Sequence, residues 1–218
     1  MTDNVNTRRA YRSDLRRNQA EQTQMAVLKA AETLFREQGW ARTTIAAIAR
    51  KAGVSNETIY AVFGNKRALL ERLVRDAIRG AEPQIPLLEQ AGVQEIAETS
   101  SQSGQIRVFA HSIAAILNRV APLIATARSA AESDPRLADL YRGLHEGRRR
   151  NLEFVASALT ANGPLRNGMD QIAATETIFR LASPELFLLF TTVEERSVED
   201  FAEWLEGALT ALLLPPDS

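Results

Sequence analysis

The feature that most constrains this chain is the stretch 43–70, in which two short helical patterns flank a turn that contains glycine. Apolar residues repeat at helical spacing over residues 45–49 and again over residues 59–63. Between them, Gly53 can adopt the positive φ that ends a helix, and Ser55 can cap the next helix. The pattern predicts a helix-turn-helix, whose second helix enters the major groove of DNA.

The second helix of this pair is expected to present a polar outer face. If Ile59, Val62 and Phe63 point to the core, that face is short and nearly free of bulky aliphatic side chains. It then consists of Asn56, Glu57, Tyr60 and Ala61. Spacing alone leaves a plain helical hairpin with a solvated face as the alternative, because helix-turn-helix patterns are short and easily matched.

The same residues resemble the N-terminal domain of TetR/AcrR-type transcriptional regulators. That family typically shows a Thr and then IA–x–x–AGVS–x–x–T–(L/I)–Y–x–x–F–x–x–K–x–x–L. This chain carries Thr44, Ile48-Ala49, Ala52-Gly53-Val54-Ser55, Thr58-Ile59-Tyr60, Phe63, Lys66 and Leu69, within a match that runs from residue 22 to residue 75. The resemblance implies a three-helix DNA-binding domain joined to a larger helical domain that binds a small molecule and forms a dimer.

Charge is distributed unevenly along the chain. Residues 1–67 hold 12 Lys/Arg and 6 Asp/Glu, a net charge of +6, whereas the remainder carries −7 and the whole chain −1. A basic first third on an acidic remainder fits a module that faces phosphates, attached to a body with another role. The five Arg among residues 1–20 predict either a disordered, solvated tail or a basic arm on DNA, and this segment could also prolong the first helix.

The rest of the chain also reads as helix, so the expected fold is all-α with about nine helices. Residues 21–80 are expected to form the DNA-binding domain and its connecting helix, and residues 81–218 the ligand-binding and dimerisation domain. Pro122 is expected to interrupt one helix and Pro184 to kink or split another. Asp134-Pro135 and Ser197 are start signals for two more helices.

The last two helical patterns are apolar over a wide arc. They form either core on both faces or, as the resemblance implies, a dimer seam in which each subunit contributes two helices. A two-fold pair is also expected because one short recognition helix contacts too few bases. The interface predicted on this basis comprises Leu186, Phe190, Trp204, Leu205, Ala208, Leu209 and Leu212.

A ligand pocket is predicted around Arg148, which interrupts an apolar helical stripe between Leu144 and Leu152. Arg148 could hold a ligand carboxylate or phenol there, or it could extend outward or pair with a nearby acid. The candidate pocket residues are Phe109, His111, Ile113, Tyr141, His145, Arg148 and Phe179. The aromatic residues among them fit ordinary core equally well.

The recognition helix allows roles to be assigned residue by residue. Asn56 could pair with adenine, and Glu57 could accept from cytosine or complement the helix N-terminus. Tyr60 is expected at a phosphate or a thymine methyl group, and Ala61 offers only apolar contact. With the positions that meet the phosphate backbone in the family, the predicted DNA-binding set is Arg42, Thr43, Thr44, Ser55, Asn56, Glu57, Thr58, Tyr60, Ala61 and Lys66.

Catalytic and metal sites find no support in the sequence. There is no Cys, the two His lie far apart, and neither a nucleophile elbow nor a phosphate-binding glycine loop occurs. No signal peptide or apolar run long enough to span a membrane is visible. We therefore expect a cytoplasmic homodimer without metal or cofactor, most simply a repressor that binds double-stranded DNA and responds to a small-molecule inducer. The alternative is an all-helical small-molecule-binding protein or enzyme without DNA recognition.

Overall fold

The computed structural model describes residues 3–132 and 134–216, and the side chains from residue 17 onward within those ranges. The chain divides into two compact units, one ending at Leu73 and the other beginning at Val74. This division falls inside helix α4 (Lys66–Arg79), ahead of residue 80, where the sequence suggests the end of the first domain. All elements of the described residues are helical and none is a strand, which confirms the all-α prediction.

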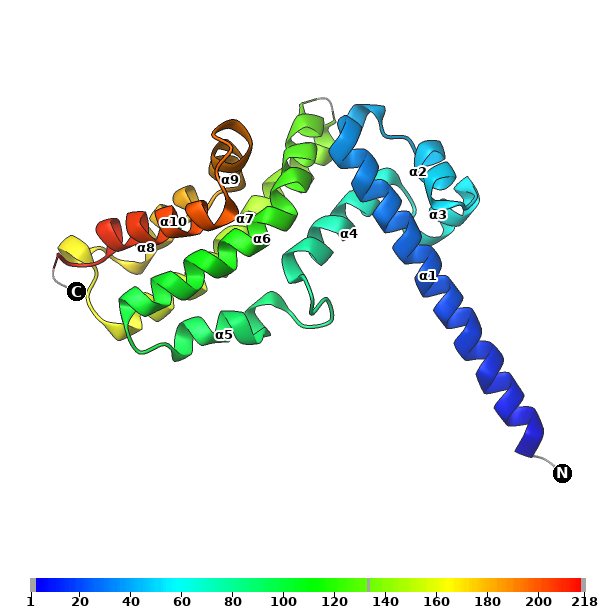
Figure 1. The fold of residues 1–218 in the computed structure, drawn as a ribbon, viewed down its shortest axis with the longest axis horizontal. Helices are drawn as coiled ribbons and strands as arrows, with labels where there is room; N and C mark the ends of the chain where they lie inside the picture. Colours follow the sequence, from blue (N-terminus) through cyan, green and yellow to red (C-terminus); the bar gives the residue numbers. More distant parts are fainter. Residues whose placement is uncertain (1–2, 133, 217–218) are drawn as a thin grey trace. The chain divides into compact units, whose positions relative to one another are not determined.

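The N-terminal unit contains α1 (Asp3–Arg42), α2 (Ile45–Ala52), α3 (Asn56–Phe63) and the start of α4 (Figure 1). Helix α1 begins well ahead of the expected residue 21, so residues 3–20 prolong the first helix. It changes direction at Gly39, whose φ of 72° is not helical. The core of this unit is formed by side chains that are almost fully buried: Val27, Ala31, Phe35, Ile48, Ile59, Leu69 and Leu70.

The C-terminal unit is built around two long helices, α6 (Gln102–Ala131) and α7 (Pro135–Asn162), which lie side by side (Figure 1). Helices α5 (Ala91–Glu98), α9 (Pro184–Leu188) and α10 (Val198–Leu213) pack on α6, and α8 (Gln171–Leu181) packs on α7. Short 3₁₀ turns occur at Leu87–Glu89 and Arg166–Gly168, and a π-helical turn at Leu189–Val193 follows α9.

The predicted break at Pro122 is wrong, because α6 runs through this residue without interruption. Proline lacks the N–H of a helical hydrogen bond and normally kinks or breaks a helix. Here the apolar stripe is buried on both sides of it, with Leu117 and Leu123 each only 1% exposed. Burial on both sides keeps one helix axis in place, and the Thr126 hydroxyl donates to the Pro122 carbonyl.

Other helix boundaries follow the sequence signals. Asp134 caps α7 with Pro135 at its first position, and the chain splits between α8 and α9 immediately before Pro184. Ser197 begins α10 in a reciprocal capping box with Asp200. These ends confirm predictions made from capping residues and prolines.

Helix α6 is long and apolar enough to cross a membrane by length and composition alone. The sequence showed no uninterrupted apolar run of that length, because isolated polar residues punctuate this helix. It contacts α5, α7, α9 and α10, as the central helix of a folded domain does.

Candidate nucleic-acid interface and ligand cavity

The turn between α2 and α3 has the geometry that its sequence predicts. Thr44 Oγ1 accepts from the backbone N–H of Ala47 at 3.1 Å and caps α2, which ends at Gly53 with φ 71°. Ser55 Oγ then accepts from the Thr58 N–H at 3.2 Å and caps α3. Two helices joined in this way form the helix-turn-helix of the prediction.

Helix α3 presents the expected outer face with one correction. Ile59 is fully buried and Tyr60 is 54% exposed, as predicted, and the side chains of Asn56 and Glu57 are exposed. Val62, expected in the core, is 42% exposed, because α3 is packed along the narrow arc centred on Ile59. The exposed face is therefore broader and more apolar toward its C-terminal end than the sequence suggested.

Glu57 lies at the N-terminus of α3, where backbone N–H groups favour a negative charge. Its own backbone N–H and the Ser55 side chain lower the pKa of its carboxyl group. This local arrangement supports the role of a helix-terminus complement, one of the two roles predicted for Glu57.

Thr43 does not fit the DNA-binding role predicted for it. The side chain is fully buried, and its hydroxyl lies 2.8 Å from the Gly39 carbonyl and 3.1 Å from the Leu34 carbonyl. These contacts hold the C-terminal end of α1, so Thr43 is a structural residue in this conformation.

Lys66 was predicted to be a phosphate contact, but its ammonium group is turned into the unit. Nζ donates to the Trp40 carbonyl at 2.9 Å and to the Thr43 carbonyl at 2.7 Å, and it lies 4.0 Å from the centre of the Trp40 ring. Burial lowers the pKa of this amine. The geometry assigns Lys66 to the loop after α1, and the predicted phosphate contact would require these bonds to break.

Other exposed basic side chains of this unit lie in the last turns of α1 and α2. Arg42 is exposed, and its Nε donates to the Gln38 carbonyl at 3.1 Å. Arg50 and Lys51, in the last turn of α2, are also exposed and were absent from the predicted set. Their signal was present in the sequence, because two basic residues directly precede the turn.

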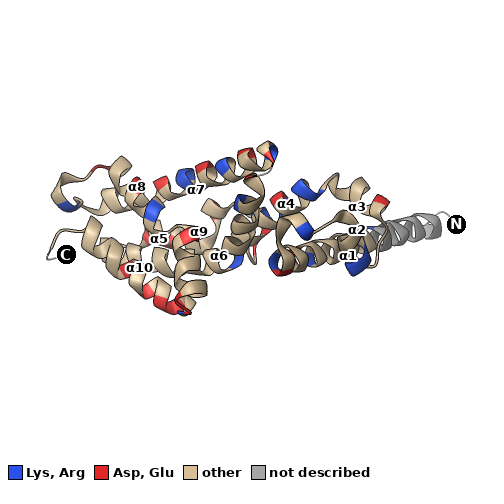
Figure 2. Cartoon of the chain, turned by 90° about the horizontal axis from the view of Figure 1, so that it is seen from above, with Lys and Arg blue, Asp and Glu red and all other residues tan. Residues whose placement is uncertain are grey.

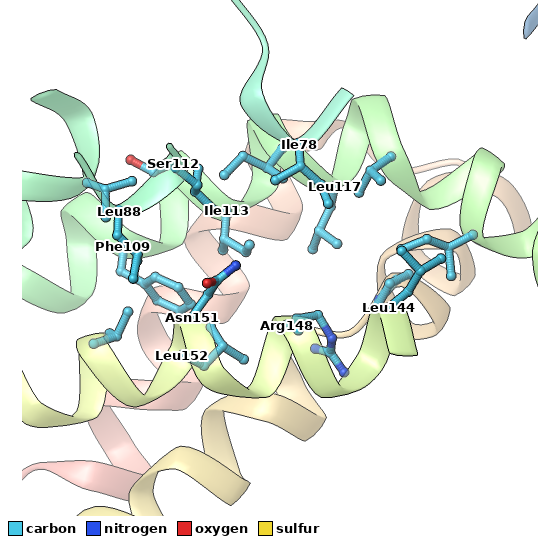
Figure 3. A pocket seen from close by; sticks show the side chains of 18 of the residues that line it. Ile78, Leu88, Phe109, Ser112, Ile113, Leu117, Leu144, Arg148, Asn151 and Leu152 are labelled. Atoms are coloured by element: carbon cyan, nitrogen blue, oxygen red, sulfur yellow. The ribbon is translucent and has the colours of Figure 1, made fainter. Parts of the chain in front are cut away.

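The C-terminal unit contains a cavity of about 210 Å³ between α5, α6 and α7 (Figure 3). Its wall is largely aliphatic and includes Ile78 at the end of α4 as well as Leu117 on α6. Of the predicted pocket residues, Phe109, Ile113 and Arg148 line it. No acidic side chain belongs to the wall.

Tyr141, His145 and Phe179 lie around a second, open hollow, which corrects their predicted place in the main pocket. Arg148 borders both spaces. Its Nη1 donates to the Phe179 carbonyl at 2.8 Å and to the Ala182 carbonyl at 3.1 Å, at the C-terminal end of α8. The guanidinium carbon also lies 3.8 Å from the centre of the Phe179 ring. Arg148 therefore neither extends into solvent nor forms an ion pair with a described acid.

Burial governs the protonation of the groups around this hollow. The Tyr141 hydroxyl donates to Glu185 Oε1 at 2.8 Å, and burial together with this carboxylate raises the pKa of Tyr141 to about 12. Burial and the nearby Arg148 lower the pKa of His145. Burial also lowers the pKa of Arg148 to about 10.

His111 does not reach the main cavity, contrary to the prediction. It lies on the side of α6 that faces α10, where Nδ1 is 3.4 Å from Glu199 Oε1 and Nε2 is 3.8 Å from Glu206 Oε2. Glu199 belongs to the acidic first turn of α10, drawn red in Figure 2. A helical repeat fixes how residues are spaced but not which of two neighbouring helices each one meets.

The cavity residues that sequence reasoning missed include Ser112 and Asn151. Asn151 follows Arg148 by three residues and Gly147 by four, so it shares their face of α7. That spacing was the available signal for its position.

The predicted dimer residues divide between core and surface. Leu205 and Leu209 are fully buried within the chain, which corrects their assignment to an interface. The side chains of Leu186, Phe190, Trp204 and Ala208 are half-buried. Leu212 is 47% exposed and Ile172, which was not predicted, is 75% exposed.

Among the side chains of residues 17–132 and 134–216, no three His, Asp or Glu are grouped so that they could hold a metal ion.

Residues 27–73 match the family model described as bacterial regulatory proteins, tetR family. The HTH-type transcriptional regulator TtgR of Pseudomonas putida is 41% identical over 58 residues, which are 27% of this chain and 28% of TtgR. Hence the match to this curated relative spans little more than a quarter of its length. YdeS of Bacillus subtilis, an uncharacterized HTH-type transcriptional regulator, is 27% identical over 177 residues, which cover 80% of this chain and 82% of YdeS.

Among solved structures, NalD of Pseudomonas aeruginosa, described as the secondary repressor of the MexAB-OprM multidrug efflux pump, superposes with a TM-score of 0.70. The match covers 92% of this chain and all of the NalD chain at 21% identity. At this identity the likeness establishes a shared fold across both units.

Proposed function

We propose that the chain is a regulator of the tetR family, and that it is a repressor that binds an inverted-repeat operator as a homodimer and is released by a small-molecule inducer. The observation that carries this proposal is the exposed polar face of α3, a helix capped by Ser55 and supported by the buried Ile59. A short, rigid helix with such a face fits the major groove.

In this proposal, Asn56 reads a base edge and Tyr60 meets a phosphate or a thymine methyl group. Thr44, Ser55 and Thr58 lie at or near the helix N-termini, where backbone N–H groups favour phosphates. Other contacts to the DNA backbone come from Arg42, Arg50 and Lys51.

Dimerisation is proposed because the recognition helix α3 is short. Helix α3 has only eight residues, so a single copy contacts few base pairs. The exposed apolar side chains Ile172 and Leu212 belong to α8 and α10, the two helices proposed to form the seam between subunits.

Release is proposed to begin in the cavity between α5, α6 and α7. Ile78 in its wall belongs to α4, the helix that continues into the N-terminal unit. An inducer shifts the protein away from operator only by the difference between its affinities for the released and bound forms. Repression, in place of activation, is supported by the described role of NalD.

A second candidate is a helical small-molecule-binding protein without DNA recognition. Two observations favour it: Lys66 is turned into the unit, and the first turn of the recognition helix carries the acidic Glu57. Both reduce the positive potential near α3, and positive potential drives DNA binding.

Selection of binding sites from random duplex DNA by the purified protein distinguishes the two candidates. Enrichment of an inverted repeat supports the repressor, and the distance between half-sites then gives the spacing of the two recognition helices. If only weak, salt-sensitive binding without enrichment is found, the second candidate replaces the first.

Asn56→Ala provides the residue-level test on the enriched site. We expect a loss of ~1–3 kcal/mol at one base pair and relaxed preference there, because one pair of base-edge hydrogen bonds is removed. Arg42→Ala is the matched contrast, since it should weaken all sequences alike and lower the salt slope by about one. An unchanged sequence preference in Asn56→Ala would rule out its assignment as a base reader.

A further inference from the structure

Two glycines of α7 border the cavity, Gly147 half-buried and Gly143 exposed to solvent. Gly143 and Gly147 are one turn apart in a helix of 28 residues, and both belong to the cavity wall. Glycine destabilises a helix interior relative to alanine, and neither position has the positive φ that would require it. The local fold of α7 therefore gives no reason for these two glycines.

The space above the two glycines is open. An added Cβ would meet no heavy atom within 4 Å at Gly143, and only Arg150 Nη2, at 3.8 Å, at Gly147. Glycines in packed helices usually allow another backbone to approach closely. Here no part of the described chain occupies that space, although α6 and α7 pack against each other elsewhere along their length.

An unpaired carboxamide projects into the same space, in addition to the buried Nε of Arg148, which has no hydrogen-bond partner among the described residues either. The carboxamide of Asn151, one turn beyond Gly147, points between α6 and α7 (Figure 3). Asn151 is half-buried, and its side chain makes no hydrogen bond or ion pair with any other residue among those described. A carboxamide offers both a donor and an acceptor, and the wall around it is otherwise apolar except for Ser112 and Arg148.

We propose that the Gly143–Gly147 face of α7 is the floor of a slot for a flat aromatic ligand, and that Asn151 binds a single ligand group that both donates and accepts, such as a phenol. The missing side chains leave the helix backbone open to the flat face of a ring. The aliphatic side chains of α6, among them Ile113 and Ile116, cover the opposite face.

The charge of the wall restricts the ligand further. A cationic ligand has no carboxylate to meet, and Arg148 borders the cavity. A carboxylate ligand would lose its hydration in this wall, and only Nε of Arg148 is free to meet it, because Nη1 donates to two carbonyls of α8 and Nη2 lies 3.4 Å from His145 Nδ1. A neutral phenol avoids both penalties and satisfies Asn151.

This inference rests on the proposed ligand-responsive function and specifies its ligand class. Calorimetric titration of the full chain with naphthalene, 2-naphthol, 2-naphthoate and 2-naphthylmethylammonium tests the class directly. We expect 2-naphthol to bind most tightly, on the order of tenfold better than naphthalene, with the ammonium compound weakest. Tightest binding by naphthoate or the ammonium compound overturns the assignment.

Variants then test the two parts of the slot. Asn151→Leu should reduce 2-naphthol affinity to that of naphthalene and leave naphthalene affinity unchanged. Gly147→Leu should abolish binding of both, because its side chain occupies the floor. Gly207→Leu in α10 is the control, since a Cβ there meets no atom within 4 Å and the residue lies outside the cavity.

Circular dichroism and the thermal midpoint show whether each variant folds, and Gly143→Leu replaces Gly147→Leu if the latter does not. If the folded Gly147→Leu or Gly143→Leu variant binds 2-naphthol with the affinity of the wild type, the proposed slot is wrong. A wild-type chain that selects no operator but binds 2-naphthol in this Gly147-dependent way leaves the slot established and removes the regulatory function. If the chain selects an operator but does not bind 2-naphthol, the slot is overturned and the proposed DNA-binding function stands.

Discussion

Lys66 belongs to a sequence motif that predicts a DNA contact, but in the structure its side chain stabilises the loop after α1. Its ammonium group joins the Trp40 and Thr43 carbonyls and covers the Trp40 ring, which stacks on Phe35 with centroids 5.6 Å apart. Thr43 itself is buried against α1. These contacts place the start of α2, and so the whole helix-turn-helix, relative to α1.

We predict that Lys66→Met lowers the free energy of unfolding of the N-terminal unit by ~1–3 kcal/mol, because two carbonyls lose a charged donor. Denaturation followed by Trp40 fluorescence in a Trp204→Phe background measures this change. Arg67→Met is the matched control: its exposed pair with Glu71, at 3.4 Å, should contribute less than ~1 kcal/mol. Equal effects of both variants would contradict the structural role of Lys66.

His145 gives a residue-scale prediction for pH. Burial lowers its folded-state pKa below the usual value of 6.5, so above that value the residue is neutral in both states. As pH falls through 6.5, the unfolded chain binds a proton before the folded chain does, and stability decreases until the folded-state pKa is passed. We therefore expect the C-terminal unit to lose stability on acidification in this window.

His145→Gln should flatten this dependence between about pH 7.5 and pH 5.5, a range above the titration of most carboxyl groups. Thermal midpoints measured across that range provide the test. His111→Gln, at the chain's other histidine, should leave the difference between the two ends in place. If the slope of the thermal midpoint against pH survives in His145→Gln but disappears in His111→Gln, the pH dependence comes from His111 and the prediction for His145 is wrong.

At the scale of elements, helix ends depend on single capping residues. Ser197 begins α10: its Oγ accepts from the Asp200 N–H at 3.0 Å and its own N–H donates to Asp200 Oδ2 at 2.9 Å. Ser197→Ala should destabilise the C-terminal unit by ~1 kcal/mol, read from its denaturation midpoint. Glu203→Ala, on the exposed side of the same helix, should change stability by less than ~0.5 kcal/mol.

The same elements show what the sequence could predict. Caps such as Thr44, Ser55 and Asp134 act on residues two or three positions away, so their roles could be derived from local sequence. Pro122 was misjudged because its effect depends on side chains buried by other helices, which local patterns do not contain.

The site residues show the same difference between features that local sequence determines and features that depend on packing against other helices. The outer face of α3 was predicted from spacing, because a helix repeat determines which residues share a face. The cavity was only partly predicted: Arg148 interrupts an apolar stripe visibly, whereas His111 and Tyr141 share the helical spacing of true wall residues. Asn151 could not be predicted as a wall residue, because a polar residue on a long helix is usually solvated.

At the scale of the whole molecule, the proposed function involves a second copy of the chain. The C-terminal helices keep large apolar side chains in solvent, and Ile172 and Leu212 are the members on α8 and α10. Leu205 and Leu209 on α10 are fully buried, so this helix packs inward by one face and offers another to a partner. Such a face would be buried in a two-fold interface between identical subunits.

Leu212→Glu is therefore expected to convert the dimer into a monomer, because two carboxylates would be desolvated against apolar surface. The circular dichroism spectrum should stay unchanged, since Leu212 is 47% exposed within the chain. Operator affinity should fall by at least ~100-fold, because each monomer retains only one recognition helix. Sedimentation velocity and DNA titration on the same preparations measure both effects.

Ile85→Glu is the matched control, an equally drastic change at a residue that is 36% exposed but lies outside α8 and α10. It should remain dimeric and bind operator normally. If Leu212→Glu stays dimeric, the seam lies elsewhere on the C-terminal unit. If it becomes monomeric but keeps full affinity, one copy of α3 suffices for recognition, and an inducer could not act by changing the distance between two recognition helices.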